Sequence, residues 1–316
     1  MKVLITGGTG FLGSRLCERL VRAGHDLCVL TRNPLARIGQ AGVQFLSWDG
    51  QEWEHALAEA QAVINLAGEP IAEGRWTAAQ KARIRESRVH ATRQLVGRMA
   101  SRLEKPAVLI NASAIGYYGP CGEEEVTEAD PPGHGFLAET CRAWEAEAQR
   151  AEDLGVRVVR LRLGVVLGPS GGALAKMVPP FVLFLGGPIG SGRQWVSWIH
   201  REDVVGMIEW ALSHPQVSGA VNVTAPHPVT MREFCETLGR VLGRPSWLPV
   251  PAWALRLWLG EMAQVLVTGQ RVIPHAATRG QYAFIYPDLQ AALEAALASY
   301  SARVLPDDSQ ATQSRG

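Results

Sequence analysis

The chain has 316 residues, of which 47% are hydrophobic and 19% charged, and its formal net charge is +1. This length fits one large domain or two intimately joined ones, with enough apolar residues for a core. A near-neutral balance provides no general attraction to nucleic acid or to an anionic membrane, so we expect neither as a partner. The longest apolar stretches, Met177–Gly190 and Leu248–Gly269, are broken by prolines or charges, which argues against a membrane span.

The five cysteines are scattered and include no C-x-x-C pair. An odd number without metal-type spacing favours reduced thiols over a disulfide framework or a zinc site. We therefore expect a cytoplasmic protein without a metal centre. The chain begins with a strand pattern, so no signal peptide is expected, and the polar, aperiodic segment 301–316 is predicted to be a disordered tail.

The first elements predict a dinucleotide-binding turn. Met1–Ile5 is typical of a buried strand and Ser14–Ala23 of a helix, with Thr6–Gly13 between them. This order is the context that the fingerprint requires, because N–H groups at the helix start then face the phosphates. The alternative is a glycine-rich turn that binds nothing. The glycines fit two registers: Gly8, Gly10 and Gly13, or Gly7, Gly10 and Gly13.

The end of the second strand indicates which dinucleotide is bound. NAD-binding folds usually place a carboxylate there to hold the ribose 2′-hydroxyl. This strand ends instead at Thr31 and Arg32, and a guanidinium can pair with a 2′-phosphate. We predict NADP(H) over NAD(H), with Arg37 as a second candidate partner; the alternative for Arg32 is a solvated turn. Asp49, after the third strand, could accept a hydrogen bond from the adenine or cap a turn.

Strand and helix patterns continue to alternate along the chain. The alternation predicts an α/β fold with a doubly wound parallel sheet, whose ligand crevice lies beyond the carboxyl ends of the strands. The segments concerned are strands 26–31, 43–48, 62–66, 107–112 and 156–161 and helices 77–103 and 136–154. Small residues after the fourth strand, Ala67 and Gly68, would let a cofactor lie against the backbone. The basic residues of helix 77–103 are expected on a solvated face: Lys81, Arg83, Arg85 and Arg88.

The pattern becomes looser after residue 170. We therefore predict a dinucleotide-binding Rossmann domain over 1–170 and a smaller substrate lobe, with additions to the sheet, over 171–300. The expected elements of the second part are strands 195–199 and 221–224 and helices 204–213 and 231–242. Thr230 is expected to cap the last of these helices, with Glu233 completing a capping box.

Several motifs in this order resemble the extended short-chain dehydrogenase/reductase superfamily, and more closely its atypical "epimerase family protein" branch, which is NAD-dependent epimerase/dehydratase-like. They are Thr6–Gly13, Asn65–Gly68, Ser113–Gly119, Arg162–Gly168, Gly186–Gly192, Trp198–Val204 and Gly269–Pro274. The resemblance implies a Rossmann domain that binds NADP or NAD, a substrate-covering C-terminal part, and a Tyr-x-x-x-Lys pair whose tyrosine is the general acid/base. The residues expected to contact the cofactor are Thr6, Gly7, Gly10, Phe11, Leu12, Gly13, Thr31, Arg32, Asp49, Leu66, Ala67, Gly68, Ser113 and Gly164.

The sequence departs from the family pattern at the catalytic pair. None of its five tyrosines is followed by lysine four positions later, and the helical segment Phe136–Glu145 contains neither residue. The remaining catalytic candidates are Ser113, Tyr117 and Tyr118, for each of which packing or a structural hydrogen bond is the alternative. The candidates for substrate contact are Glu69, Arg193, Gln194 and Trp195. His200 and Asp203 are expected to hold the C-terminal part on the sheet.

Two functions therefore remain open. One is an NADP-dependent oxidoreductase or nucleotide-sugar-type epimerase that acts on a small substrate through a proton relay other than the usual pair. The other is a catalytically silent protein that binds NADP(H) and signals its redox state.

Overall fold

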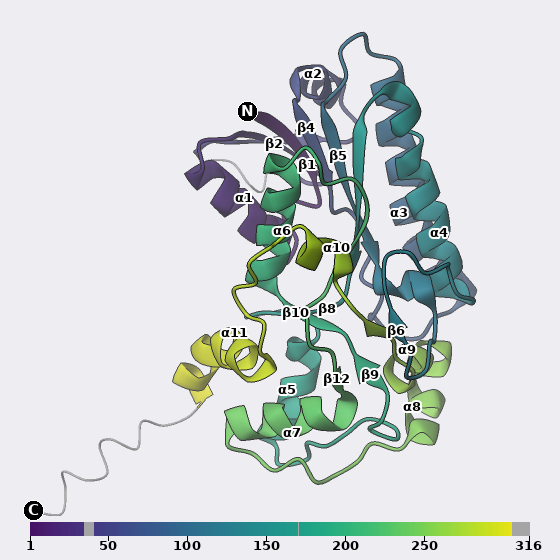
Figure 1. The fold of residues 1–316 in the computed structure, drawn as a ribbon, viewed down its shortest axis with the longest axis vertical. Helices are drawn as coiled ribbons and strands as arrows, with labels where there is room; N and C mark the ends of the chain where they lie inside the picture. Colours follow the sequence, from purple (N-terminus) through teal and green to yellow (C-terminus); the bar gives the residue numbers. More distant parts are fainter. Residues whose placement is uncertain (35–40, 170, 305–316) are drawn as a thin grey trace, which may run out of the picture.

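The computed structural model describes residues 1–34, 41–169 and 171–304 (Figure 1). Arg37 lies outside these residues. The tail was predicted to begin at residue 301, but the last helix, α11 (Leu289–Val304), continues into that segment. Residues 305–316 lie outside the described part of the chain.

A seven-stranded parallel sheet forms the centre of the molecule, in the order β11-β7-β5-β4-β1-β2-β3. Its strands are β1 (Lys2–Thr6), β2 (Asp26–Thr31), β3 (Val43–Ser47), β4 (Ala62–Asn65), β5 (Val108–Ala114), β7 (Arg157–Leu163) and β11 (Gly219–Val223). The order reverses between β1 and β4, which is the switch point of a doubly wound sheet. The predicted fold class is confirmed.

Helices cover both faces of the sheet, so its strands are apolar on both sides. Val3 and Ile5 pack on one face with α1 (Gly13–Arg22) and α6 (Arg201–Ser213). Leu4, which points the opposite way, belongs to the core of the other face. That face is covered by α2 (Glu52–Glu59), α3 (Ala78–Ala100) and α4 (Phe136–Gln149), of which α3 and α4 run together on the right of Figure 1.

A second hydrophobic core lies beyond the carboxyl ends of the strands, in the lower part of Figure 1. It forms around Trp198 and Phe234, which are both fully buried. Its elements are β8 (Val165–Leu167), α5 (Leu174–Val182), β9 (Trp195–Val196), β10 (Trp198–His200), β12 (Val229–Thr230), α7 (Met231–Leu242) and α11. Next to this core lie α8 (Ala252–Leu259), η4 (Gly260–Met262) and α9 (Ala263–Val267). The remaining short elements are η2 (Ile115–Tyr118), β6 (Glu125–Val126), η3 (Glu152–Leu154), β13 (Arg271–Val272) and α10 (His275–Arg279). The lobe thus covers the edge of the sheet where ligands of such folds bind.

The chain returns to the main sheet after entering this lobe. Both α6 and β11 follow β10 in the sequence. α6 packs on one face of the main sheet, and β11 joins that sheet by pairing with β7. The single strand predicted over 195–199 is in fact two strands, because Ser197 turns away to bind another segment. Its Oγ donates to the carbonyl of Gln270 at 2.7 Å and accepts from the N–H of Val272 at 2.8 Å.

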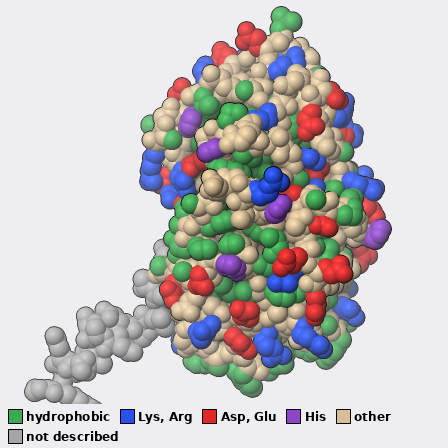
Figure 2. All heavy atoms as spheres, in the orientation of Figure 1, with side chains coloured by type: hydrophobic (Ala, Val, Ile, Leu, Met, Phe, Trp, Pro, Cys, Tyr) green, Lys and Arg blue, Asp and Glu red, His purple; other side chains and the backbone are tan. Residues whose placement is uncertain are grey.

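Charged side chains of both signs are interspersed over the face drawn in Figure 2, and hydrophobic side chains are most concentrated across its middle. Within the described residues, no helix is both long enough and apolar enough to cross a membrane. All five cysteines are free thiols, as predicted.

Candidate cofactor and active site

The glycine turn has the tight geometry that the sequence predicts. Gly7 has φ +69°, and a Cβ there would lie 2.6 Å from the carbonyl carbon of Leu66. A Cβ at Gly13 would lie 2.2 Å from the carbonyl oxygen of Gly7, so helix α1 can approach the turn only without a side chain. Gly8 packs on Val29, where a Cβ would lie 2.7 Å from Cγ1. Gly7, Gly8 and Gly13 therefore leave no room for a side chain, whereas a Cβ at Gly10 would lie 3.3 Å from the Gly7 carbonyl oxygen.

The start of α1 leaves backbone donors without partners. Leu12 is the N-cap, and no side chain caps the helix. Among the described residues, the N–H groups of Phe11 and Leu12 form no hydrogen bond. The Phe11 ring packs instead against the chain near Gly171 and Gly172, where added Cβ atoms would lie 2.5 and 3.1 Å from it. Free N–H groups at a helix N-terminus favour a phosphate.

Five buried residues joined by uncharged hydrogen bonds form what we call the neutral cluster: Thr6 and Asn65 at the ends of β1 and β4, Asn111 in β5, Thr92 on α3 and Trp144 on α4. The Thr6 hydroxyl donates to Asn65 Oδ1 at 2.5 Å. Asn65 Nδ2 donates to Asn111 Oδ1 at 2.6 Å and to Thr92 Oγ1 at 2.8 Å. Trp144 Nε1 donates to the same Thr92 hydroxyl at 2.9 Å. The cluster ties the switch point to α3 and α4.

The neutral cluster also positions the backbone after β4, against which the cofactor was predicted to lie. Thr6 Oγ1 also accepts from the N–H of Ala67 at 3.2 Å, which fixes the chain after β4. Gly68 lies against the side chain of Arg88, and a Cβ there would lie 3.0 Å from the guanidinium carbon. The N–H of Glu69 donates to Ser87 Oγ at 3.0 Å. Segment 66–69 is therefore held in place by β1 on one side and α3 on the other.

The position of Arg88 corrects the expectation that all the basic residues of α3 are solvated. Arg83 and Arg85 are exposed, whereas Arg88 is partly buried, with its guanidinium 5.3 Å from the Trp144 ring centroid. The helical period contained this signal, because Ile84 and Thr92, which lie four residues before and after Arg88, are both fully buried.

A second set of polar residues forms what we call the charged cluster: Ser113 and Arg162 near the ends of β5 and β7, Tyr118 of η2, Glu145 of α4 and Asn222 of β11. Arg162 and Glu145, which are 3% and 2% exposed, pair through Nε and Oε1 at 2.9 Å. Ser113 Oγ donates to the same carboxylate oxygen at 2.7 Å. Arg162 Nη1 donates to the Tyr118 oxygen at 2.8 Å, and that hydroxyl donates to Asn222 Oδ1 at 2.6 Å. The polar atoms of Ser113 and Tyr118 are thus engaged within the protein.

The two candidate tyrosines have different surroundings. Burial raises the pKa of Tyr118 to about 12, so its hydroxyl stays protonated at neutral pH. Tyr117 is only partly buried, and its ring lies 3.5 Å from the Arg162 guanidinium. Among the described residues, none forms a hydrogen bond with the Tyr117 hydroxyl. The neighbouring thiol of Cys141, on α4, is buried, and burial raises its pKa to about 12. Of the catalytic candidates, Tyr117 is therefore the one whose hydroxyl is not hydrogen-bonded to a described residue.

Of the residues predicted at the adenosine end, Arg32 and Asp49 are exposed and Thr31 is partly buried. Arg32 directly follows β2 and forms no ion pair with any described residue. Thr31 Oγ1 accepts from the N–H of Asn33 at 3.4 Å, and the N–H of Asp49 donates to Ser47 Oγ at 3.2 Å. Both Arg32 and Asp49 lie just beyond the carboxyl ends of adjacent strands, on the same side of the switch point as the glycine turn.

Of the other predicted contacts, some serve the packing of the second lobe. Gly164 brings β7 against the Ser197 carbonyl, where a Cβ would lie 2.5 Å away. Gln194 Nε2 donates to the carbonyls of Ile189 and Leu266 at 2.8 and 2.9 Å. Trp195 lies under the Arg271 guanidinium, 4.7 Å from its carbon, whereas Arg193 is exposed. Arg193 is thus the member of this trio whose polar group is available to a ligand.

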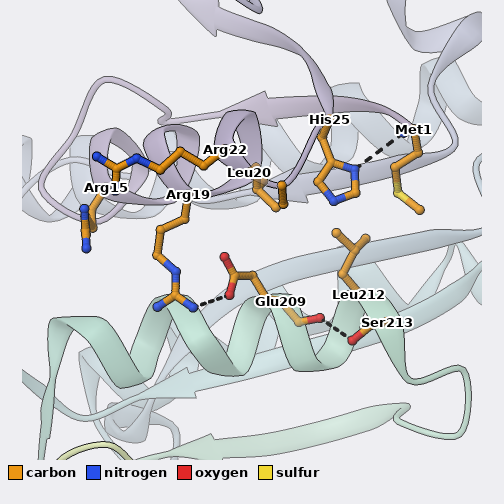
Figure 3. A pocket seen from close by; sticks show the side chains of 10 residues that line it. Met1, Arg15, Arg19, Leu20, Arg22, His25, Glu209, Leu212 and Ser213 are labelled. Carbon is orange, nitrogen blue, oxygen red and sulfur yellow. Dashed lines mark hydrogen bonds and ion pairs between the residues drawn. The ribbon is translucent and has the colours of Figure 1, made fainter.

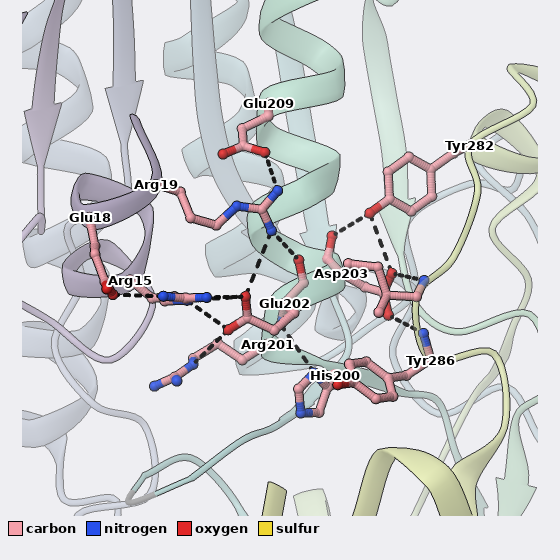
Figure 4. Close-up of polar contacts among 11 residues, drawn as sticks. Arg15, Glu18, Arg19, His200, Arg201, Glu202, Asp203, Glu209, Tyr282 and Tyr286 are labelled. Atoms are coloured by element: carbon pink, nitrogen blue, oxygen red, sulfur yellow. Dashed lines mark hydrogen bonds and ion pairs between the residues drawn. The ribbon is translucent and has the colours of Figure 1, made fainter. Parts of the chain in front are cut away.

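The start of α6 joins the sheet to the second lobe through Asp203, as predicted, whereas His200 forms a local hydrogen bond (Figure 4). The Asp203 carboxylate accepts from the N–H groups of Ile285 and Tyr286 at 2.7 and 2.9 Å. His200 caps α6 by accepting from the Glu202 N–H at 3.2 Å. The imidazole is 3% exposed, and burial lowers its pKa to about 4, so it is neutral at physiological pH.

A surface groove between α1 and α6 is separate from this site (Figure 3). It is lined by Arg19, His25 and Glu209, among others, and an Arg19–Glu209 ion pair crosses it. Because Met1 also lines it, the groove lies toward the amino ends of the strands, away from the glycine turn. None of the residues predicted to contact the cofactor is among those that line this groove.

The comparisons with known proteins agree with the geometry. Residues 3–224 match the model described as "NAD dependent epimerase/dehydratase family", and residues 250–296 match a domain of unknown function, DUF1731. The chain belongs to the NAD dependent epimerase/dehydratase family. This confirms the resemblance inferred from the sequence motifs.

Members of this family from distant organisms are similar over nearly their whole length. The chain is 44% identical to the epimerase family protein SDR39U1 homolog, chloroplastic, of Arabidopsis thaliana, covering 93% of this chain and 86% of that one. It is 43% identical to epimerase family protein YfhF of Bacillus subtilis, covering 94% and 98%. Both names carry the "epimerase family protein" designation of the branch that the motifs resemble.

Solved structures of family members share the fold. The crystal structure of human epimerase family protein SDR39U1 with NADPH has a TM-score of 0.85 and 34% identity, covering 94% of this chain and 99% of that one. UDP-glucuronic acid 4-epimerase from Bacillus cereus, in complex with UDP-glucuronic acid and NAD, has a TM-score of 0.79 but 18% identity over 96% of this chain and all of that one, a likeness in fold alone.

Proposed function

We propose that this protein binds NADP(H) along the carboxyl edge of its sheet, with the diphosphate at the start of α1. The observation that carries the proposal is the glycine turn, in which Gly7 and Gly13 have no room for a side chain while the N–H groups of Phe11 and Leu12 have no partner in the described structure. A turn with a structural role alone needs the close packing but not the free donors. The human relative that was crystallised with NADPH supports the same cofactor class.

The preference for NADP(H) over NAD(H) rests on Arg32. It lies at the end of β2, beside the switch point, and is exposed and free of carboxylate partners among the described residues. The three described residues that follow β2, Arg32, Asn33 and Pro34, include no acidic side chain that could repel a 2′-phosphate. A charge-assisted hydrogen bond to phosphate contributes roughly 1.5–3 kcal/mol.

Fluorescence titrations with NADPH and NADH test this proposal. Arg32→Ala should weaken NADPH binding by roughly 10- to 100-fold and leave NADH binding nearly unchanged. Arg256→Ala, which removes an exposed arginine of α8, is the matched control and should bind both cofactors like the wild type. Equal losses for both cofactors in Arg32→Ala would show that this side chain does not contact the 2′-phosphate.

Of the two open functions, we propose an oxidoreductase or epimerase in which Tyr117 donates the proton. Its hydroxyl forms no hydrogen bond with a described residue and its ring lies against a guanidinium, whereas Ser113 and Tyr118 hydrogen-bond within the charged cluster. The redox-sensor alternative is supported by that same engagement of Ser113 and Tyr118, because it leaves few polar groups for chemistry.

Oxidation of bound NADPH separates these two functions. A panel of small carbonyl compounds and nucleotide-linked sugars is added to the NADPH complex, and the loss of NADPH fluorescence is followed. Turnover that falls by about 100-fold or more in Tyr117→Phe, with unchanged NADPH affinity, would support the proton donor. Tight binding without oxidation by any member of the panel would favour the sensor.

A further inference from the structure

Helix α8 is apolar even on the side that faces away from the protein. Arg256 is the one polar side chain among its eight residues. Two of its leucines are buried, whereas Trp253, Leu257 and Trp258 are 70%, 74% and 74% exposed. A helix that is apolar all round is normally buried on all sides, so the outer face of α8 lacks a partner within the described part of the chain.

A second group of exposed apolar side chains lies next to α8. It comprises residues 183–185, just after α5, and residues 247–248, shortly before α8. The two segments are in contact, because Trp247 Nε1 donates to the carbonyl of Phe184 at 2.9 Å. The chain then runs along the lower edge of Figure 1 into α8. We call these two segments, together with the outer face of α8, the apolar edge.

The apolar edge differs from the rest of the described surface. It holds most of the large apolar side chains that are exposed in the described residues. Single exposed apolar side chains are normal on a folded protein, but a group of them marks a site of interaction with a protein or a membrane. The charges around the edge indicate which of these partners fits.

The charged residues of the apolar edge are all cations. The two segments of sequence that form it, 176–193 and 237–260, contain no Asp or Glu. Arg240 and Arg256 are exposed, and Arg244 lies with its guanidinium over one of the exposed aromatic rings of the edge. An occupant of complementary charge is therefore anionic.

The nearest acidic residues do not change this conclusion. Glu261, directly after the second segment, forms an ion pair with Lys81 at 2.5 Å. Glu233 lies in the first turn of α7, whereas Arg240 lies in the last turn, next to the edge. The absence of a membrane partner was expected from the net charge of +1, which describes the whole chain and not this local excess of cations.

We propose that the apolar edge binds the surface of a bilayer that contains anionic phospholipids. Tryptophan and leucine side chains of a surface helix bury at the boundary between headgroups and acyl chains, while neighbouring arginines contact the lipid phosphates. A fluid bilayer needs no shape complementary to protruding side chains such as Trp253 and Leu257. A second copy of the chain fits less well, because in a two-fold dimer the same arginines would face one another without a carboxylate.

Sedimentation of the whole chain with lipid vesicles tests the proposal. Vesicles of phosphatidylcholine and phosphatidylglycerol in equal parts should bind the wild type, and vesicles of phosphatidylcholine alone should bind it at least roughly 10-fold more weakly. Salt at about 0.5 M should weaken the binding, because it screens charges at a surface. Absence of binding to the mixed vesicles at low salt, or equal binding to both kinds of vesicle, would overturn the proposal.

Variants at exposed positions locate the contact. Trp253→Ser/Leu257→Ser removes two protruding apolar side chains and should weaken binding to the mixed vesicles by roughly 10- to 100-fold. Arg256→Gln removes one cation and should weaken it by roughly 5-fold at low salt. Leu103→Ser, which replaces a fully exposed leucine just after α3, is the matched control and should bind like the wild type. An equal loss in the double variant and in this control would overturn the assignment of the edge.

Two further measurements test the other occupants. A wild-type dimer in light scattering that Trp253→Ser/Leu257→Ser converts to a monomer would show that a second copy covers the edge. Wild-type protein that binds polyglutamate but not the mixed vesicles would show that the partner is an acidic protein. Either result would overturn the proposal. Exposed substitutions change stability little, so each variant should keep the wild-type Tm; if the double variant did not fold, Arg256→Gln and the two kinds of vesicle would still decide.

Discussion

The neutral and charged clusters lie at the carboxyl ends of adjacent strands, yet they use buried polar groups in opposite ways. In the neutral cluster, Thr6 and Asn65 fix the backbone after β4 through uncharged hydrogen bonds. In the charged cluster, the Arg162–Glu145 pair takes up the hydroxyls of Ser113 and Tyr118. The first arrangement builds a surface on which a ligand can lie. In the second, the polar side chains that could take part in catalysis are already hydrogen-bonded within the protein.

The comparison shows why cofactor binding and catalysis separate in this protein. A dinucleotide site depends on backbone N–H groups and close approach, which the glycine turn and the neutral cluster preserve. A proton-transfer site needs a polar side chain with an accessible proton. At the ends of β5 and β7, Tyr117 meets that requirement, whereas Tyr118 does not.

The largest expected effect comes from breaking the charged cluster. Arg162→Met removes the closest cation of the buried Glu145 carboxylate and leaves only Arg160, whose Nη1 lies 3.3 Å from Oε2, so the free energy of unfolding should fall by about 3–5 kcal/mol. Urea denaturation measures this loss. The double variant Arg162→Met/Glu145→Leu should recover much of it, because the buried carboxylate is removed together with its closest cation, and Arg256→Met should change stability by less than about 0.5 kcal/mol. A double variant as unstable as the single one would show that the charge itself is not the cause.

The second prediction concerns His200, a buried neutral group among charged neighbours. Its folded pKa of about 4 lies below the usual 6.5, so the unfolded chain binds its proton first as the pH falls. The stability that the neutral imidazole contributes to the folded protein is fully present above pH 6.5 and is lost as the pH falls to about 4. Because each pH unit between the two pKa values corresponds to about 1.4 kcal/mol, the whole loss is roughly 3 kcal/mol.

Urea denaturation at pH 7, 5.5 and 4 checks this prediction. His200→Gln should be less stable than the wild type at pH 7 but should lose less stability on acidification. The exposed His227, changed to Gln, is the matched control and should retain the wild-type pH dependence. Parallel acid limbs in the wild type and His200→Gln would contradict the assignment.

The smallest expected effect comes from the neutral cluster. Thr92→Val keeps the side-chain shape but removes the acceptor of Trp144 Nε1 and of Asn65 Nδ2, which should cost about 1–3 kcal/mol. Thr140, on α4, is also buried, but its hydroxyl has no hydrogen-bond partner among the described residues, so Thr140→Val should be neutral or stabilising. Chemical denaturation of both variants is the measurement, and equal costs for both would mean that the hydrogen bonds of Thr92 are not what matters.

Much of the fold followed from local patterns in the sequence. Buried parallel strands are short apolar runs, and their alternation with helices predicted the doubly wound sheet. The glycine turn was equally predictable, because φ at Gly7 and the contact of Gly13 with Gly7 are local requirements within thirteen residues. The sequence pattern predicts one strand where the structure has two short strands around Ser197. Their separation depends on partners more than seventy residues away, Gln270 and Val272.

The sequence by itself determined the sheet, the glycine turn and the family, because these depend on periodicity and on motifs with fixed spacing. Only the tertiary structure decided which polar side chains remain free to act. Ser113 and Glu145 are 32 positions apart, and Tyr118 and Asn222 are 104 positions apart, so no local pattern reveals that they bind each other. Arg88 was expected among solvated arginines, and its environment became visible only where α3 packs on Trp144 and Gly68. Burial and pairing decide the chemistry of such groups, and both are properties of the folded chain.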